Sequence, residues 1–174
     1  MNATTPMLDG AMPSEGSGGA EAARREFLTF RLGGETYGID ILQVQEIREI
    51  DRVTRVPHVA PYVRGVINLR GAIVPIVDLA LLFGFAEPLP VDKASAIVLN
   101  VDRRMVGLVV ASVSDVVALA DNEILPPPDL GERAIGRAIA GIGTRGEAGA
   151  EDGAASVLLM DVQYLMRRVR EERE

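Results

Sequence analysis

The stretch FRLGGETYGI, residues 30–39, decides the fold, because its pattern returns as LNVDRRMVGL at residues 99–108. In the first stretch, apolar and polar residues alternate on both sides of Gly33-Gly34. Alternation that is interrupted by a glycine pair is typical of a β-hairpin. The sequence therefore predicts an equivalent hairpin in each half of the chain.

The correspondence continues beyond the hairpins and predicts an internal duplication. With the same offset, VQEI at 44–47 lies on VSDV at 113–116. Two further pairs of segments correspond in the same order, with a gap: GVINLRG (65–71) with GIGTRG (141–146), and VPIVD (74–78) with VLLMD (157–161). Each copy then reads as hairpin, bent segment, strand, second hairpin and short helix. About five short strands per copy suit a small closed barrel, which leaves no exposed sheet edge.

The predicted organisation is mostly β, with two similar lobes. Lobe one covers approximately residues 26–88 and lobe two approximately residues 94–168, inside an ordered domain of residues 26–170. Residues 1–25 mix Pro, Gly, Ser, Ala and Glu without a period, so we expect a disordered tail.

Local signals add detail to this plan. Asp78 and Asp161 each precede an apolar helical turn, as N-capping residues do. Residues 53–56 are strand-like, and Pro75 predicts an edge or a bulge because proline has no N–H to donate. The second copy carries an extra acidic loop at 147–155.

Composition excludes several classes of function. The chain has no Cys and one His, which removes thiol catalysis, disulfides, zinc–thiolate sites and two-His metal sites. A net charge of -7 disfavours nucleic acid as a partner. We expect no cofactor and no metal. Neither a signal peptide nor a membrane-spanning stretch is visible, so the expected location is the cytoplasm, without membrane insertion.

Three patterns resemble catalytic motifs but have simpler explanations. GIGTRG at 141–146 fits GxGxxG, yet an acidic, helix-poor segment follows it, and a hairpin turn explains its glycines. Asp78 and Asp161 occupy equivalent positions, as in a carboxylate dyad, but lack the Thr-Gly or Ser-Gly context of aspartic proteases. His58 follows Pro57 in a loop, with no serine in a nucleophile-elbow motif.

Two positions carry a binding hypothesis. Glu46 stands between apolar neighbours, where Val44 and Ile47 would be anchors and the carboxylate would orient a partner. Arg70 is at a hairpin tip, from which its guanidinium would reach a carboxylate. A solvent-facing carboxylate and a turn-filling arginine are the alternatives, and composition does not separate the two explanations.

Residues 27–79 resemble the CheW family of bacterial chemotaxis coupling proteins. The motifs that carry the resemblance are YGID (37–40), VQEI (44–47), GVINLRG (65–71) and VPIVD (74–78), with IVLN (97–100), VGLVV (106–110) and VSDV (113–116) in the second half. The resemblance covers roughly residues 25–168. The tail and the 147–155 loop depart from the family pattern.

The resemblance implies two five-stranded SH3-like barrels that share a hydrophobic core. It also implies a non-enzymatic adaptor that joins the cytoplasmic tip of methyl-accepting chemoreceptors to the regulatory domain of the histidine kinase CheA, in membrane-associated arrays. The residues that match the family's binding positions are Val44, Glu46, Ile47, Asn68 and Arg70. The alternatives are a coupling protein of a non-flagellar chemosensory pathway and a generic SH3-like peptide-binding module.

Overall fold

The computed structural model describes residues 24–50, 52–85, 94–131, 133–145 and 155–171, and these are mostly β. The strands are β1 (Arg24–Leu32), β2 (Glu35–Asp40), β3 (Val44–Glu49), β4 (Val63–Leu69), β5 (Ala72–Asp78), β6 (Ser95–Val101), β7 (Arg104–Val110), β8 (Ser112–Ala120), β9 (Ile124–Leu125), β10 (Ile139–Arg145) and β11 (Ala155–Met160). The helical segments are η1 (Ile41–Gln43), α2 (Leu79–Leu82), η3 (Asp121–Glu123), α3 (Ala134–Arg137) and α4 (Val162–Glu171).

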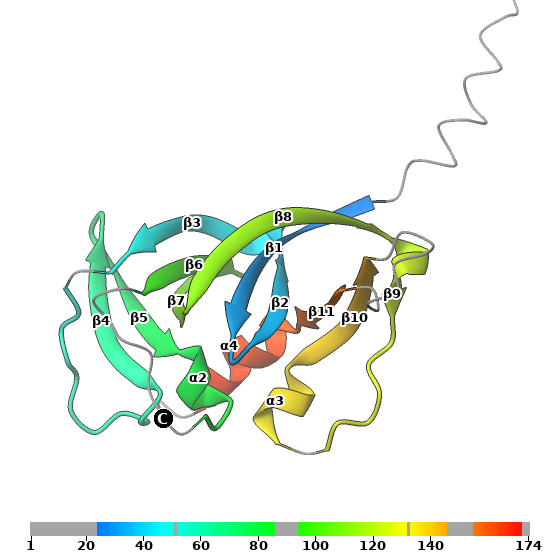
Figure 1. The fold of residues 1–174 in the computed structure, drawn as a ribbon. Coiled ribbons are helices and arrows are strands. Elements are labelled where there is room, and N and C mark those ends of the chain that lie inside the picture. Colours follow the sequence, from blue (N-terminus) through cyan, green and yellow to red (C-terminus); the bar gives the residue numbers. More distant parts are fainter. Residues whose placement is uncertain (1–23, 51, 86–93, 132, 146–154, 172–174) are drawn as a thin grey trace, which may run out of the picture.

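The strands form two sheets, which confirms the predicted architecture. One sheet has the order β8-β1-β2-β11-β10-β9 and the other has the order β3-β6-β7-β5-β4. Figure 1 shows the two sheets side by side as two lobes, with β8 arching over the top and α4 below the middle.

Each sheet contains strands from both sequence copies. The first hairpin of copy one, β1–β2, joins β8–β11 of copy two, and the first hairpin of copy two, β6–β7, joins β3–β5 of copy one. The two exchanges use equivalent registers, because Phe30 pairs with Val113 as Leu99 pairs with Val44. The expected contiguous lobes therefore describe the sequence copies, whereas each structural lobe combines the two.

Both predicted hairpins are present, and their turns share one conformation. Gly33 and Gly34 have φ values of 60° and 85°, and Asp102 and Arg103 have φ values of 51° and 67°. Two consecutive left-handed residues match the twist of the flanking strands in a two-residue hairpin. Copy one satisfies this requirement with glycine, and copy two with side chains that are strained there.

The hydrophobic core is shared between the lobes, as expected. Its largest cluster includes Phe30 and Leu32 of one sheet, Leu99 and Leu108 of the other, and residues of α2 and α4. Three smaller clusters fill the lobes separately: one around Leu119 in one lobe, and one around Ile76 and one around Leu69 in the other. The apolar interface is therefore larger than either lobe's own interior.

Tyr37 lies in the middle of the shared core. Its ring stacks on Phe30, with 5.7 Å between centroids, and packs against Phe83 at 5.8 Å. Burial, and secondarily the charge of Glu35, raises the pKa of Tyr37 above its ordinary value.

The predicted helix caps are confirmed. Asp78 Oδ1 accepts the Leu81 N–H at 3.2 Å, and Asp161 Oδ1 accepts the Tyr164 N–H at 3.0 Å. Gly84 follows α2 with φ 87°, as a C-terminal glycine does.

Some boundaries differ from the prediction. β1 begins at Arg24, inside the expected tail, because Arg24 and Arg25 pair with Ala120 and Leu119. Residues 1–23, and the expected loop at 147–155 except Ala155, lie outside the described residues. Residues 53–56 form a single bridge, Thr54 with Val66, in place of a strand.

Pro75 lies inside a sheet, so of the two expectations the edge is wrong, whereas the β4–β5 ladder does bulge, between Val63 and Gly65, one pair away from Pro75. β5 is placed between β7 and β4. Pro75 faces Val66, whose N–H and C=O both bond to Thr54 at 2.9 Å. The missing N–H of Pro75 therefore interrupts no bond to β4.

Candidate functional site

β3 is an edge strand, and its start is fixed by a capped turn. Asp40 Oδ1 accepts the Leu42 N–H at 3.0 Å, which holds η1 between β2 and β3. β3 then bulges between Val44 and Glu46 where it pairs with β6. A bulge changes which way the following side chains point. Ile47, just after it, is 46% exposed.

The hairpin tip between β4 and β5 faces this strand. Asn68 Oδ1 accepts the Gly71 N–H at 2.9 Å, and Arg70 and Gly71 take left-handed φ values of 51° and 91°. This two-residue turn directs the Arg70 side chain toward β3.

Glu46 and Arg70 form an ion pair between the edge strand and the hairpin tip. An Arg70 guanidinium nitrogen contacts Glu46 Oε2, and Arg48 Nε lies 3.9 Å from Glu46 Oε1. The Glu46 side chain is 23% exposed, against 68% for Arg70. The carboxylate that Arg70 was expected to reach is thus that of Glu46 in the same chain.

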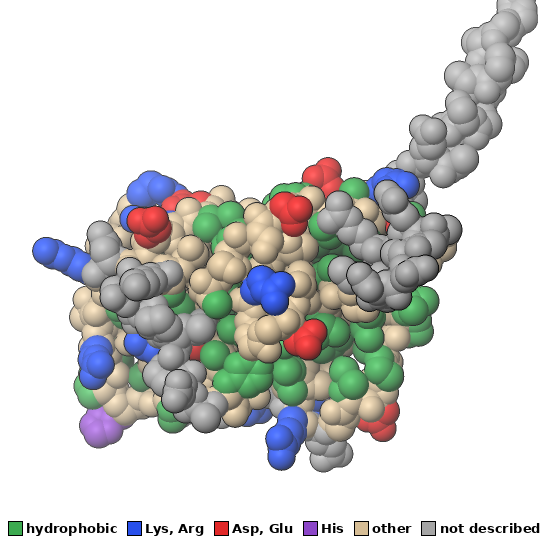
Figure 2. Space-filling model, in the orientation of Figure 1, with side chains coloured by type: hydrophobic (Ala, Val, Ile, Leu, Met, Phe, Trp, Pro, Cys, Tyr) green, Lys and Arg blue, Asp and Glu red, His purple; other side chains and the backbone are tan. Residues whose placement is uncertain are grey.

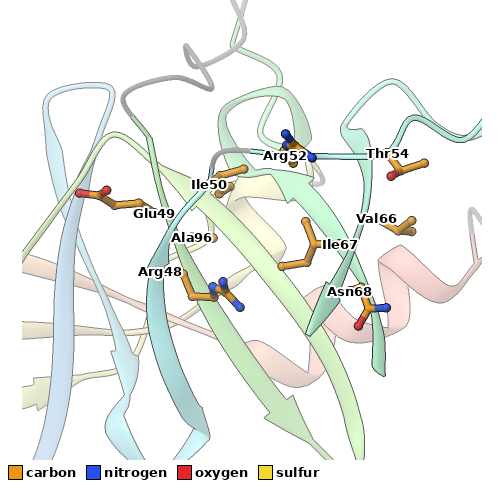
Figure 3. Close-up of a pocket in the computed structure, with 9 residues that line it drawn as sticks. All are labelled: Arg48, Glu49, Ile50, Arg52, Thr54, Val66, Ile67, Asn68 and Ala96. Carbon is orange, nitrogen blue, oxygen red and sulfur yellow. The ribbon is translucent and has the colours of Figure 1, made fainter. Parts of the chain in front are cut away.

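A groove of about 270 Å³ runs between β3 and β4 beside this ion pair. Figure 3 shows Arg48 and Ile67 pointing into the space between the strands, and Glu49 pointing away from it. The floor includes Ile50 and Ala96, which belong to the interior cluster of the lobe. The groove therefore has an apolar floor, with charged side chains along its walls.

The five residues that the sequence motifs selected have different surroundings in the structure. Glu46 and Arg70 meet directly, and Asn68 fixes the turn and also lines the groove. Val44 is half-buried and packs against the shared core, whereas Ile47 is exposed. That Val44 and Ile47 anchor a partner together stays a prediction.

Arg48 and Arg52 also line the groove, although the sequence motifs do not select them. Alternation along a strand places residues two apart on one face, so the selection of Glu46 could also have predicted a role for Arg48. No comparable signal exists for Arg52, which lies beyond the strand.

The equivalent charge in copy two has another role. Thr29 Oγ1 donates to the Asp115 backbone carbonyl at 2.7 Å or to its Oδ1 at 3.0 Å. Asp115, the counterpart of Glu46, is therefore tied to a buried threonine of the adjacent strand. In copy one the duplicated motif thus produces a cross-strand ion pair with a hairpin tip.

The catalytic-looking patterns are accounted for by structure. Gly141 and Gly143 lie within strand β10 and not in the expected turn, and their smallness serves packing, because a Cβ on Gly143 would come 2.5 Å from Leu119. Asp78 pairs with Arg64, and Asp161 caps α4. Over the described ranges, no group of three or more His, Cys, Asp or Glu is placed to hold a metal ion. None of the helices among the described residues could span a membrane.

The fold is that of a duplicated, mostly β domain built of two sheets. The family model described as a CheW-like domain matches residues 26–170. The chain belongs to the CheW family, whose members are coupling and scaffold proteins of chemotaxis.

Named relatives agree with this assignment. The chain is 41% identical over 146 residues to the chemotaxis protein CheW of Klebsiella aerogenes, covering 84% of each chain. The crystal structure of the scaffolding protein TtCheW from Thermoanaerobacter tengcongensis matches with a TM-score of 0.67 at 27% identity, over 79% of this chain and 88% of that one. A shorter match, 34% identical over 85 residues, joins 48% of the chain to 47% of protein PilI of Pseudomonas aeruginosa.

Proposed function

We propose that this protein is a non-enzymatic adaptor that binds the regulatory domain of the histidine kinase CheA and the cytoplasmic tip of methyl-accepting chemoreceptors. It acts in the cytoplasm and is recruited to membrane-associated receptor arrays. Membership of the CheW family and the chemotaxis relatives support this proposal. The structurally similar Thermoanaerobacter protein is a scaffolding protein, which agrees with an adaptor role.

The observation that carries the proposal is the Glu46–Arg70 ion pair beside the exposed Ile47. Ile47 alternates with Glu46 and Arg48 along β3 and so points to the other face of the strand. A strand that offers an exposed apolar side chain on one face and an ion pair on the other has the mixed composition of a protein-binding surface. In this proposal Ile47 is the anchor, Glu46 orients the partner, and Asn68 holds the turn that directs Arg70. Val44 contributes by packing β3 onto the core.

The test compares charge changes at the site with matched changes elsewhere. Glu46→Lys and Arg70→Ala are titrated by calorimetry against a receptor cytoplasmic fragment and against the kinase regulatory domain. We expect each to weaken binding to at least one partner by roughly 1–3 kcal/mol, about fivefold or more, since each removes an oriented charge. Thermal melts followed by circular dichroism should show a loss of at most about 1 kcal/mol, which is the scale of a partly exposed ion pair.

Two controls make the comparison specific. Glu35→Lys changes net charge as Glu46→Lys does, but at the exposed start of β2. Arg103→Ala removes an arginine from another hairpin tip with a similar φ of 67°. If Glu46→Lys and Arg70→Ala both bind with the affinity of the parent protein, the proposed site is wrong. If the parent protein binds neither partner, the proposed function is wrong.

A second candidate is a coupling protein of a non-flagellar chemosensory pathway, favoured by the similarity to PilI. The chemistry of the surface is the same in both cases, so binding alone does not separate them. Deleting the gene and scoring swimming against surface motility does: loss of surface motility alone assigns the second pathway.

A further inference from the structure

A second hollow lies between the loop at residues 55–61, β4 and α2. Its volume is about 400 Å³, and its apolar lining includes Val63 and Leu81. Every charged or titratable side chain that lines it, among the residues the structure describes, is basic: Arg55, His58 and Arg64. In a chain of net charge -7, this hollow is thus a place where the described lining contributes no acidic side chain.

Arg64 is held in the wall of this hollow by a buried carboxylate. Arg64 NH1 donates to Asp78 Oδ2 at 3.0 Å, and the Asp78 side chain is 0% exposed. An ion pair fixed in this way keeps the guanidinium in one orientation, which reduces the entropy lost when a ligand binds.

The second sequence copy shows that the cap itself does not require this arginine. Asp78 N–H donates to the Tyr62 carbonyl at 2.7 Å, and Asp161 N–H donates to the Ala138 carbonyl at 2.6 Å. Two residues after Tyr62 the chain has Arg64, whereas two residues after Ala138 it has Ala140. Asp161 still caps α4. Arg64 is thus an addition of copy one, beyond what capping needs.

His58 has an unusual backbone at the rim of the hollow. Its φ is 62°, in the left-handed region, although it is not glycine. Such a conformation is strained for a residue with a side chain, and strained residues cluster at functional sites. Figure 2 shows the histidine, in purple, at the molecular surface, with several arginine side chains, in blue, on the same side of the view.

We propose that this hollow binds a phosphate-type oxyanion, either free phosphate or the phosphoryl group of a small metabolite. Arg64 is the fixed donor, and Arg55 and His58 approach the anion from the loop. A tetrahedral dianion offers several acceptor oxygens, so donors from different directions are satisfied at once, and bonds between charged groups are the strongest. The proposal is independent of kinase and receptor binding.

The single histidine provides a direct assay. Its ring signals in a proton NMR spectrum need no assignment, so the full-length protein is titrated with inorganic phosphate at fixed pH, and with sodium chloride at matched ionic strength. We expect a saturable shift with phosphate and none with chloride. A shift that does not saturate, or that chloride reproduces, overturns the proposal.

Two variants locate the site. Arg55→Gln changes an exposed loop side chain and is expected to weaken phosphate binding by about fivefold or more. Arg104→Gln, in the separate hollow beside α4, is the matched control and should bind like the parent. Equal affinities of parent and Arg55→Gln would refute the assignment. A parallel titration with glycerol 3-phosphate identifies the source: tighter binding than inorganic phosphate assigns a metabolite, and equal binding assigns the free ion.

Discussion

Gly65→Ala tests whether close packing in β4 maintains the groove wall. Gly65 has φ 145°, and a Cβ there would lie 2.2 Å from the Thr54 carbonyl oxygen and 2.7 Å from Val53 Cγ1. The nearest atom is backbone, which does not rotate away. Thr54 would have to move, and its two 2.9 Å bonds to Val66 would be lost with it.

The expected loss of stability follows from these contacts. A forbidden backbone conformation costs about 1–3 kcal/mol, and each lost hydrogen bond about 1 kcal/mol. The free energy of unfolding should therefore fall by roughly 3–5 kcal/mol, and Tm by roughly 6–20 °C at about 2–4 °C per kcal/mol. Thermal melts followed by circular dichroism measure this directly.

Gly34→Ala is the control for Gly65→Ala. Gly34 also has a left-handed φ, 85°, but no atom lies within 4 Å of the added Cβ. Its cost is the backbone conformation alone, about 1–2 kcal/mol. If the two variants melt at the same temperature, close approach to Thr54 does not limit stability, and the reasoning is refuted.

Three further perturbations address other features. Glu46→Arg and Arg70→Glu should each lower the free energy of unfolding by at most about 1 kcal/mol. In a double-mutant cycle measured by urea unfolding, the variant that carries both changes should regain part of that stability. Additive losses would mean that the two side chains do not interact. The pKa of Tyr37 is raised in the folded state, so Tyr37 ionises first in the unfolded chain. The contribution of the neutral Tyr37 side chain to stability is therefore complete below pH 10.0, and it is lost as the pH rises through the folded-state pKa. Tyr37→Phe should make the alkaline fall of the urea midpoint shallower, and an unchanged slope would contradict that origin. Arg103→Gly should raise Tm by about 2–4 °C by relieving the left-handed strain, and an unchanged or lower Tm would show that no strain is stored there.

The sequence alone predicts the local elements well. Alternation around Gly33-Gly34 and the carboxylates at 78 and 161 are short-range signals, and hairpins and caps form over a few residues. The start of β1 has no such signal, because Arg24 and Arg25 are exposed and polar, although their backbones pair with β8.

Long-range features are not predictable in the same way. An alternating hairpin has the same pattern whether it pairs within its own copy or with the other, so the exchange of β1–β2 and β6–β7 leaves no trace in the sequence. The Glu46–Arg70 pair joins positions 24 residues apart and depends on how the sheet brings β3 to the hairpin tip. The motif predicts that both charges matter, but not that they meet.

The exchanged hairpins also suggest how the molecule is related to an oligomer. Equivalent registers at both exchanges are what a symmetric dimer shows when each subunit lends its first hairpin to the other. This chain has that arrangement with the two subunits joined, so its assembly does not depend on concentration. Joining them also ends the requirement that the halves be identical. Glu46 pairs with Arg70 whereas Asp115 accepts a hydrogen bond from Thr29, so equivalent positions of the two copies have taken on different structural roles.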